Sequence, residues 1–191
     1  MNINITDEQL MIRIGSGDRT AYKILVERHL RPYLVFATRV IQDRAGAEDI
    51  MQEAFVRVWK NASKWDQDRK THFTTWFYRV VMNLCIDAKR KYKPAVDLAE
   101  AYDVQSDEIQ PDAHLSEKQM AAEIATALKH LPDRQRMAMT LCYLQGLGNK
   151  EAADILGVTT SAMESLLVRG RKKMAELLSA HKKAFIEETM R

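Results

Sequence analysis

The sequence has little cysteine, proline or glycine, and these shortages exclude several classes of protein. Its two cysteines, Cys85 and Cys142, stand far apart outside any Cys-x-x-Cys motif, so neither a disulfide framework nor a zinc site is indicated. Four prolines and seven glycines among 191 residues are too few for a β-rich or disordered chain. No apolar run approaches the roughly 18 residues of a membrane span, and the N-terminus lacks the basic start and apolar core of a signal peptide. We therefore expect a soluble cytoplasmic protein with no membrane insertion.

Catalytic and metal-binding patterns are also missing from the sequence. The five histidines are scattered, and none stands at a spacing that suits a His/Asp/Ser arrangement or a set of metal ligands. Each histidine is therefore interpreted as a surface or capping residue. We expect no catalytic residue, no metal and no cofactor, and hence a protein that is not an enzyme.

Helix-forming residues dominate what is present, and charge is distributed unevenly along the chain. Residues 1–93 hold 17 Lys or Arg against 11 Asp or Glu, and residues 118–191 hold 12 against 8. Between them, residues 94–117 hold seven carboxylates and no Lys or Arg. This pattern predicts an all-α chain with two small helical domains, 1–93 and 116–191, joined by a flexible acidic linker, 94–115. The basic blocks favour a polyanionic partner, although their excess of positive charge is modest. An acidic linker is most often simply solvated and extended.

Capping and stop signals divide the two blocks into helices. Thr6-Asp7-Glu8-Gln9 and Ser116-Glu117-Lys118-Gln119 are capping boxes, and Asp18 and Asn149 are further candidate N-caps. Glycines mark helix ends, and Pro32 is expected to kink or split the helix that contains it. Pro132 fits a first helical turn. In the first block we expect a short helix ended by Gly15 and Gly17, a second helix that begins at Asp18, and helices at 45–62 and 73–93 with a loop at 61–72. In the second block we expect one helix from Ser116 and further helices at 132–144, 149–156 and 161–180.

The helix expected at 45–62 has an unusual polar face. At about 100° per residue, one stripe is apolar throughout and consists of Ala47, Ile50, Met51, Ala54, Phe55 and Val58. The opposite face carries Asp49, Gln52, Glu53 and Lys60, with Val56 in its middle and Trp59 at its border. An apolar centre ringed by polar groups is typical of a protein-binding surface. The alternative is a solvated helix whose valine is exposed without a partner.

The helix expected at 73–93 is apolar almost all round, except for one narrow polar stripe. The stripe consists of Arg79, Asn83, Asp87 and Arg90, with Trp76 beside them, and a basic run from Lys89 to Lys93 follows. An aromatic ring can stack on an unpaired base while cations neutralise phosphates, which favours single-stranded nucleic acid. The alternative is a buried central helix in which Trp76 belongs to the core and the basic end complements the helix dipole.

The helices expected at 149–156 and 161–180 are separated by Gly157, which is typical of a helix-turn-helix motif. Met163, Leu167, Gly170, Met174 and Leu177 are predicted to face the core. Small polar residues at the start of the second helix would approach base edges, and cations further along would meet phosphates. A purely structural helical hairpin is the alternative.

Three of these segments together resemble one family, the extracytoplasmic-function (group IV, sigma-70 family) bacterial RNA polymerase sigma factors. Residues 47–59 resemble its polymerase-binding helix, and Asn83, Asp87, Arg90 and Lys91 resemble the end of its promoter-melting helix. The run 131–136, Gly146 and the run 151–157 resemble its fourth-domain helix-turn-helix. In contrast to most members, Gly148-Asn149 follows the glycine turn and Glu164-Ser165-Leu166 stands in the recognition helix, so the promoter sequence is not transferable.

The resemblance implies a function, partners and site residues. We expect an alternative sigma factor that binds core RNA polymerase through the β′ clamp helices and the β flap, binds promoter DNA and is restrained by an anti-sigma factor. The implied polymerase contacts are Asp49, Gln52, Glu53, Val56 and Trp59. The implied downstream-promoter contacts are Lys64, Trp65, Arg69, Lys70, Trp76, Arg79, Asn83, Arg90 and Lys91. The implied upstream contacts are Ser161, Glu164, Ser165, Arg169, Arg171, Lys172 and Lys173.

Two other classes of protein remain as alternatives at this point. An ordinary helix-turn-helix regulator would use its N-terminal block to sense a ligand, but it gives no reason for the pattern from Asp49 to Trp59. An enzyme is the weaker alternative because no catalytic spacing occurs in the sequence.

Overall fold

The computed structural model describes residues 5–66, 71–92 and 115–189, and every regular element in these ranges is helical. The chain divides into two compact units, residues 1–94 and 95–191, which are described separately below. The all-α prediction is confirmed. Most of the predicted acidic linker lies outside the described residues. Among the helices that are described, none combines the length and the apolarity that a membrane span requires.

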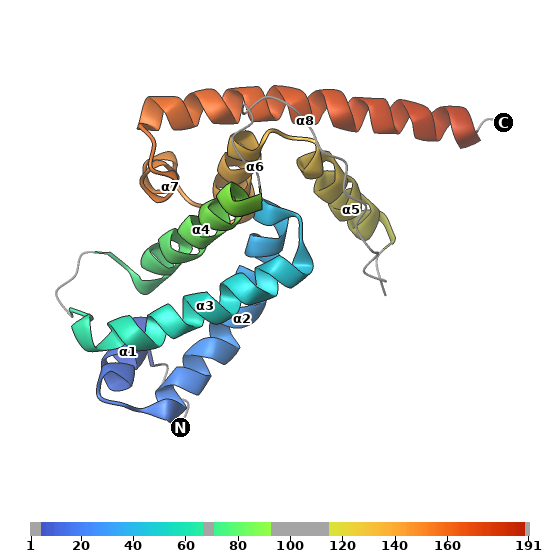
Figure 1. The fold of residues 1–191 in the computed structure, drawn as a ribbon. Coiled ribbons are helices and arrows are strands. Elements are labelled where there is room, and N and C mark those ends of the chain that lie inside the picture. Colours follow the sequence, from blue (N-terminus) through green and yellow to red (C-terminus); the bar gives the residue numbers. More distant parts are fainter. Residues whose placement is uncertain (1–4, 67–70, 93–114, 190–191) are drawn as a thin grey trace. The chain divides into compact units, whose positions relative to one another are not determined.

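The first unit consists of α1 (Asp7–Gly15), α2 (Arg19–Ile41), α3 (Arg44–Asn61), the short 3-10 turn η1 (Ala62–Lys64) and α4 (Phe73–Tyr92) (Figure 1). Thr6 forms the predicted capping box with Gln9, and the Asp18 side chain accepts from the backbone N–H of Thr20 and of Ala21. Helices α2, α3 and α4 pack on one another, and α1 packs on α2. Their shared core is rich in aromatic rings, among them Phe36, Phe55 and Phe77.

The apolar stripe predicted for α3 is confirmed residue by residue. All six members, from Ala47 to Val58, are buried. Because the stripe faces the core, the opposite side of α3 lies at the surface.

Pro32 does not split its helix, so that part of the prediction is wrong. Helix α2 runs unbroken from Arg19 to Ile41 with Pro32 inside it. Pro32 itself is exposed, whereas its neighbour Tyr33 is buried and its hydroxyl donates to the Thr74 carbonyl of α4 at 3.0 Å. Tertiary packing on both sides of the proline thus holds the helix together and outweighs the missing backbone hydrogen bond.

The second unit consists of α5 (Leu115–Lys129), α6 (Asp133–Met139), the π-helical segment η2 (Thr140–Leu144), α7 (Asn149–Leu156) and α8 (Thr160–Thr189). Helix α8 packs against α5, α6 and α7 (Figure 1). Gly170 permits its close approach to α6, because a Cβ atom there would lie 2.9 Å from Cγ of Met139.

Several predicted helix ends are displaced by one or more residues. Gly148 rather than Asn149 is the N-cap of α7, and Pro132 is the N-cap of α6 rather than part of its first turn. Helix α5 already begins at Leu115, before the predicted cap Ser116, and the side chains of that capping box lie outside the described residues. Helix α8 continues past residue 180 to Thr189.

Candidate interfaces with protein and nucleic acid

The outer side of α3 presents all five residues that were predicted to bind a protein. We call Asp49, Gln52, Glu53, Val56 and Trp59 the α3 surface, and each of them is exposed. Val56 and Trp59 are 40% and 39% exposed, which makes them two of the few large apolar side chains at the surface of the described residues. Glu53 accepts from Arg57 at 3.0 Å, so the polar rim is itself partly ordered. The arrangement matches an apolar centre within a polar rim.

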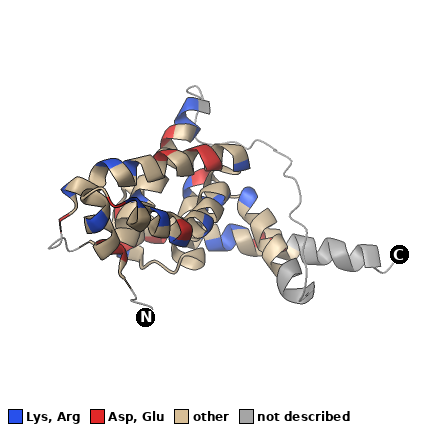
Figure 2. Cartoon of the chain, turned by 90° about the horizontal axis from the view of Figure 1, so that it is seen from below, with Lys and Arg blue, Asp and Glu red and all other residues tan. Residues whose placement is uncertain are grey.

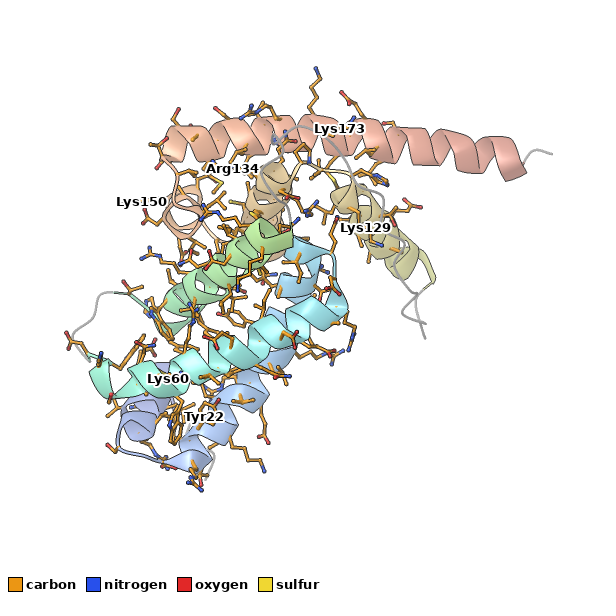
Figure 3. All side chains as sticks on the ribbon, viewed as in Figure 1. Tyr22, Lys60, Lys129, Arg134, Lys150 and Lys173 are labelled. Atoms are coloured by element: carbon orange, nitrogen blue, oxygen red, sulfur yellow. The ribbon has the colours of Figure 1, made fainter. Side chains whose placement is uncertain are left out.

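Tyr22 of α2 supports the α3 surface, and sequence reasoning missed it. Its ring meets the Trp59 ring edge-on, with centroids 5.2 Å apart and an interplanar angle of 81°. Its hydroxyl donates to the Phe55 carbonyl at 3.1 Å (Tyr22 is labelled in Figure 3). Partial burial raises the pKa of the Tyr22 hydroxyl, so this donor keeps its proton near neutral pH. An aromatic pair of this geometry restricts the orientation of Trp59 before any partner binds.

The residues predicted to contact the downstream promoter divide into an exposed group and an aromatic cluster. Lys64, Arg79, Asn83, Arg90 and Lys91 are exposed, whereas Arg69 and Lys70 lie outside the described residues. Trp65 and Trp76 are half-buried and pack edge-to-face at 5.5 Å, and both also contact the Phe73 ring. Trp76 therefore fits both the core interpretation and the base-stacking interpretation. Its ring packs against the core, and part of the ring remains exposed.

Glu8 of α1 fixes the start of α4, which sequence reasoning also missed. The Phe73 backbone N–H donates to its Oε1 at 3.0 Å, and the pKa of Glu8 is lowered chiefly by this hydrogen bond. Asp7 beside it forms an ion pair with Arg28 and lies 2.8 Å from the His29 Nε2 atom. His29 is buried against the Phe73 ring, so its interpretation as a surface or capping residue is wrong. Burial opposes ionisation of Asp7, but the bonds to His29 and Arg28 outweigh burial and lower its pKa. The two carboxylates thereby tie α1 to α2 and to the first turn of α4.

The turn that precedes α4 is also held by α1. Gly15 ends α1, and a Cβ atom on it would lie 2.6 Å from the carbonyl oxygen of Ala62, at the start of η1. Only a glycine at this position lets the end of α1 contact the backbone of η1. The short turn η1 lies at the start of the predicted promoter-reading segment.

Helices α7 and α8 form the predicted helix-turn-helix. Gly157 ends α7 in the left-handed region at φ 67°, where a glycine is favoured, and α8 begins three residues later. Of the predicted core face, Met163, Leu167, Gly170 and Met174 are buried and Leu177 is half-buried. The predicted upstream contacts are all exposed: Ser161, Glu164, Ser165, Arg169, Arg171, Lys172 and Lys173.

The cations of α8 are not equivalent in the structure. Arg169, Lys172 and Lys173 line a groove of about 290 Å³ with Pro132, Gln135 and Glu176, and Lys173 lies 3.7 Å from the Glu176 carboxylate. Arg171 points elsewhere, because its Nη1 donates to the hydroxyl of Tyr143 at 2.8 Å. Figure 2 shows lysine and arginine distributed among acidic residues along the described helices. A contact with DNA would therefore depend on single basic side chains.

Arg136 belongs to the motif that carries the resemblance, yet it lies in the interior. It is 2% exposed, forms an ion pair with Asp133, and donates to the Leu131 carbonyl at 2.9 Å. Burial lowers its pKa, against the opposing effect of Asp133. Its role in this geometry is to join the end of α5 to α6 rather than to contact DNA.

Comparison with known proteins gives concordant matches in both units. The models described as Sigma-70 region 2 and Sigma-70, region 4 match residues 25–94 and 121–174. The chain is 28% identical over 176 residues to the ECF RNA polymerase sigma factor SigW of Bacillus subtilis, with 87% of this chain and 93% of SigW covered. It is also 28% identical over 189 residues to the RNA polymerase sigma factor CnrH of Cupriavidus metallidurans, with 94% and 98% covered.

Solved structures show the same fold. The structure of CnrH in complex with the cytosolic domain of CnrY matches with a TM-score of 0.65 at 24% identity, covering 91% of this chain and 97% of that chain. The sigma factor RpoE in complex with the anti-sigma factor NepR, from Bartonella quintana, matches with a TM-score of 0.61 at 20% identity, covering 83% and 96%.

Proposed function

The chain belongs to the extracytoplasmic-function sigma factors of the sigma-70 family, and from this premise we propose that it binds core RNA polymerase and directs it to specific promoters. The observation that carries the proposal is the exposed α3 surface, with Val56 at its centre, Trp59 at its border and carboxylates beside them. A helix-turn-helix regulator would bind DNA without needing such a surface. A sigma factor needs it because it acts only when bound to the polymerase.

In this proposal the α3 surface binds the β′ clamp helices of the polymerase. Val56 and Trp59 supply the apolar contact that hot spots require, and Tyr22 holds the Trp59 ring in place. Asp49, Gln52 and Glu53 form the polar rim that sets orientation. The second unit contacts the β flap, so that the two units occupy separate sites on one polymerase.

The α4 stripe and the preceding loop bind the opened strand of the downstream element. Arg79, Asn83 and Arg90 are exposed along one side of α4, where cations neutralise phosphates and the amide reads a base edge. The segment at 61–72 was predicted as a loop but begins with the end of α3 and with η1. It includes Lys64, Trp65, Arg69 and Lys70, and it holds a base that has left the stack.

The helix-turn-helix binds the duplex of the upstream element. Ser161, Glu164 and Ser165 lie at the N-terminal end of α8, which enters the major groove in this motif. Arg169, Lys172 and Lys173 lie further along, where side chains meet phosphates.

The domain organisation belongs to the same proposal. Residues 1–93 act as sigma domain 2, residues 94–115 as the linker, and residues 116–191 as sigma domain 4. An anti-sigma factor restrains the free protein, which is supported by the two similar structures that were solved as complexes with a CnrY cytosolic domain and with the anti-sigma factor NepR.

The test is co-elution of the full-length chain with core RNA polymerase, followed by permanganate footprinting of promoter DNA. We expect a stable complex, and unstacked thymines near the start site only when both components are present. A chain that binds DNA alone and never associates with core polymerase would identify a regulator of another kind.

A further inference from the structure

Tyr143 and Arg171 form an exposed pair that joins η2 to α8. Arg171 Nη1 donates to the Tyr143 hydroxyl at 2.8 Å across 28 residues of sequence. Tyr143 is 51% exposed, and it stands in the π-helical segment that leads into the helix-turn-helix.

The position of Arg171 on α8 places the pair beside the DNA-facing part of that helix. Arg171 follows Glu164 by seven residues, so the two side chains leave α8 on the same side, two turns apart. In a helix-turn-helix the N-terminal turns enter the major groove. The later turns on the same side therefore pass over the backbone that borders the groove, where phosphate contacts fix the register.

The charge of Arg171 is left for an external anion. No carboxylate of the described residues lies within ion-pair distance of it, whereas Lys173 has Glu176 and Arg136 has Asp133. Its only described side-chain partner is the neutral phenol of Tyr143.

The chemistry of the pair suits one phosphate group. A phenol hydroxyl has acceptor lone pairs and a single proton, and Arg171 occupies an acceptor position. The proton of Tyr143 is then directed away from the guanidinium and can be donated to a second group, while Arg171 retains further N–H donors. We propose that Tyr143 and Arg171 together bind a single backbone phosphate of the upstream promoter DNA. This site rests on the proposed function and adds to it a contact made outside the recognition helix.

The experiment uses holoenzyme reconstituted from the full chain and core polymerase, with duplex DNA that carries a preferred upstream element. Tyr143→Phe removes the hydroxyl and keeps the exposed ring, and we expect affinity to fall about tenfold or more, because the lost hydrogen bond goes to a charged group. The loss is the same for all upstream sequences, since a phosphate carries no base information.

Salt dependence separates the two members of the pair. Arg171→Ala removes a cation, so the slope of log affinity against log salt becomes shallower by about one. Tyr143→Phe removes no charge and leaves the slope unchanged. The double variant loses less than the sum of the two single losses, because both side chains hold the same phosphate. The matched control is Ser179→Ala, which removes an exposed α8 hydroxyl that donates to the Ala175 carbonyl of its own helix.

A methylphosphonate scan of the DNA locates the site. Neutralising the contacted phosphate weakens binding by the wild-type holoenzyme and weakens binding by Tyr143→Phe less. A Tyr143→Phe affinity equal to that of the wild type and of Ser179→Ala overturns the proposal, as does a loss that depends on base sequence. If the wild-type holoenzyme does not protect the upstream element, that result refutes the proposed function itself. Failure of the phosphate site alone is seen only when the wild type protects the element and Tyr143→Phe binds it equally well.

Discussion

Val56→Glu is the sharpest test of the α3 surface. Val56 is 40% exposed, and full burial of a valine contributes about 1.5–3 kcal/mol, so covering the rest of the side chain contributes roughly 0.6–1.2 kcal/mol. The new carboxylate would also be buried without a partner, at a cost of about 1–3 kcal/mol. The sum is about 2 kcal/mol or more, the size of a hot-spot loss, and 2 kcal/mol corresponds to roughly 30-fold weaker binding of core polymerase.

The fold offers a matched control on a neighbouring helix. Val35 of α2 is 42% exposed and lies outside the α3 surface, so Val35→Glu adds the same charge at a site of equal exposure. Affinity is measured by titrating labelled chain with core polymerase. Stability is followed by tryptophan fluorescence, which reports on the first unit alone because Trp59, Trp65 and Trp76 all lie there. Unchanged core affinity in folded Val56→Glu, or an equal loss in Val35→Glu, would refute the reasoning.

Three further predictions concern DNA and pH. Asn83→Ala leaves core binding unchanged and reduces promoter opening about tenfold, measured by permanganate reactivity, because an exposed amide on α4 is lost. Lys172→Ala weakens binding to all upstream elements evenly and makes the slope of log affinity against log salt shallower by about one. Glu164→Gln instead changes which base is preferred at one position, with a change in discrimination of about 1–3 kcal/mol, measured by selection from randomised elements. The first unit loses stability in acid, because the pKa values of Asp7 and Glu8 are lowered from 3.8 and 4.5. Their contribution to stability is complete above those pH values and is lost as pH falls below them. The Tm of the first unit, followed by tryptophan fluorescence, therefore decreases with falling pH in that range, and it decreases less in Glu8→Gln.

Each of these predictions has an outcome that contradicts it. Normal opening by Asn83→Ala would confine strand binding to the loop at 61–72. An unaltered base preference in Glu164→Gln would leave that residue with only a helix-dipole role. An equal acid sensitivity of Glu8→Gln and the wild type would mean that the bond to the Phe73 backbone contributes nothing measurable.

The features that the sequence predicted well are those that depend on one helix at a time. The α3 stripe needs only the 3.6-residue period and a core on one side, and each of its residues is buried. The Thr6 and Asp18 caps are equally local, since each side chain bonds to the backbone two or three residues on. Exposure of the candidate contacts on α3, α4 and α8 follows from the same periodicity, while their roles stay predictions.

The features that were missed depend on which helices lie side by side. Glu8 meets Phe73 across 65 residues, Tyr22 meets Phe55 across 33, and Arg171 meets Tyr143 across 28. No period within one helix indicates such a pairing. Pro32 was misjudged for the same reason, because packing around it decides whether the helix continues. The end of α6 as a π-helix also escaped prediction, since the change from α to π geometry carries no compositional signal.

Run-off transcription tests the central claim most directly. The full chain is combined with core RNA polymerase on a library of templates with randomised promoter regions, and transcript starts are mapped. We expect transcripts only when chain and core are both present, starting at a fixed distance from a two-part element whose upstream half changes in Glu164 variants. A chain that binds the library yet produces no chain-dependent start would contradict the assignment of sigma-factor activity.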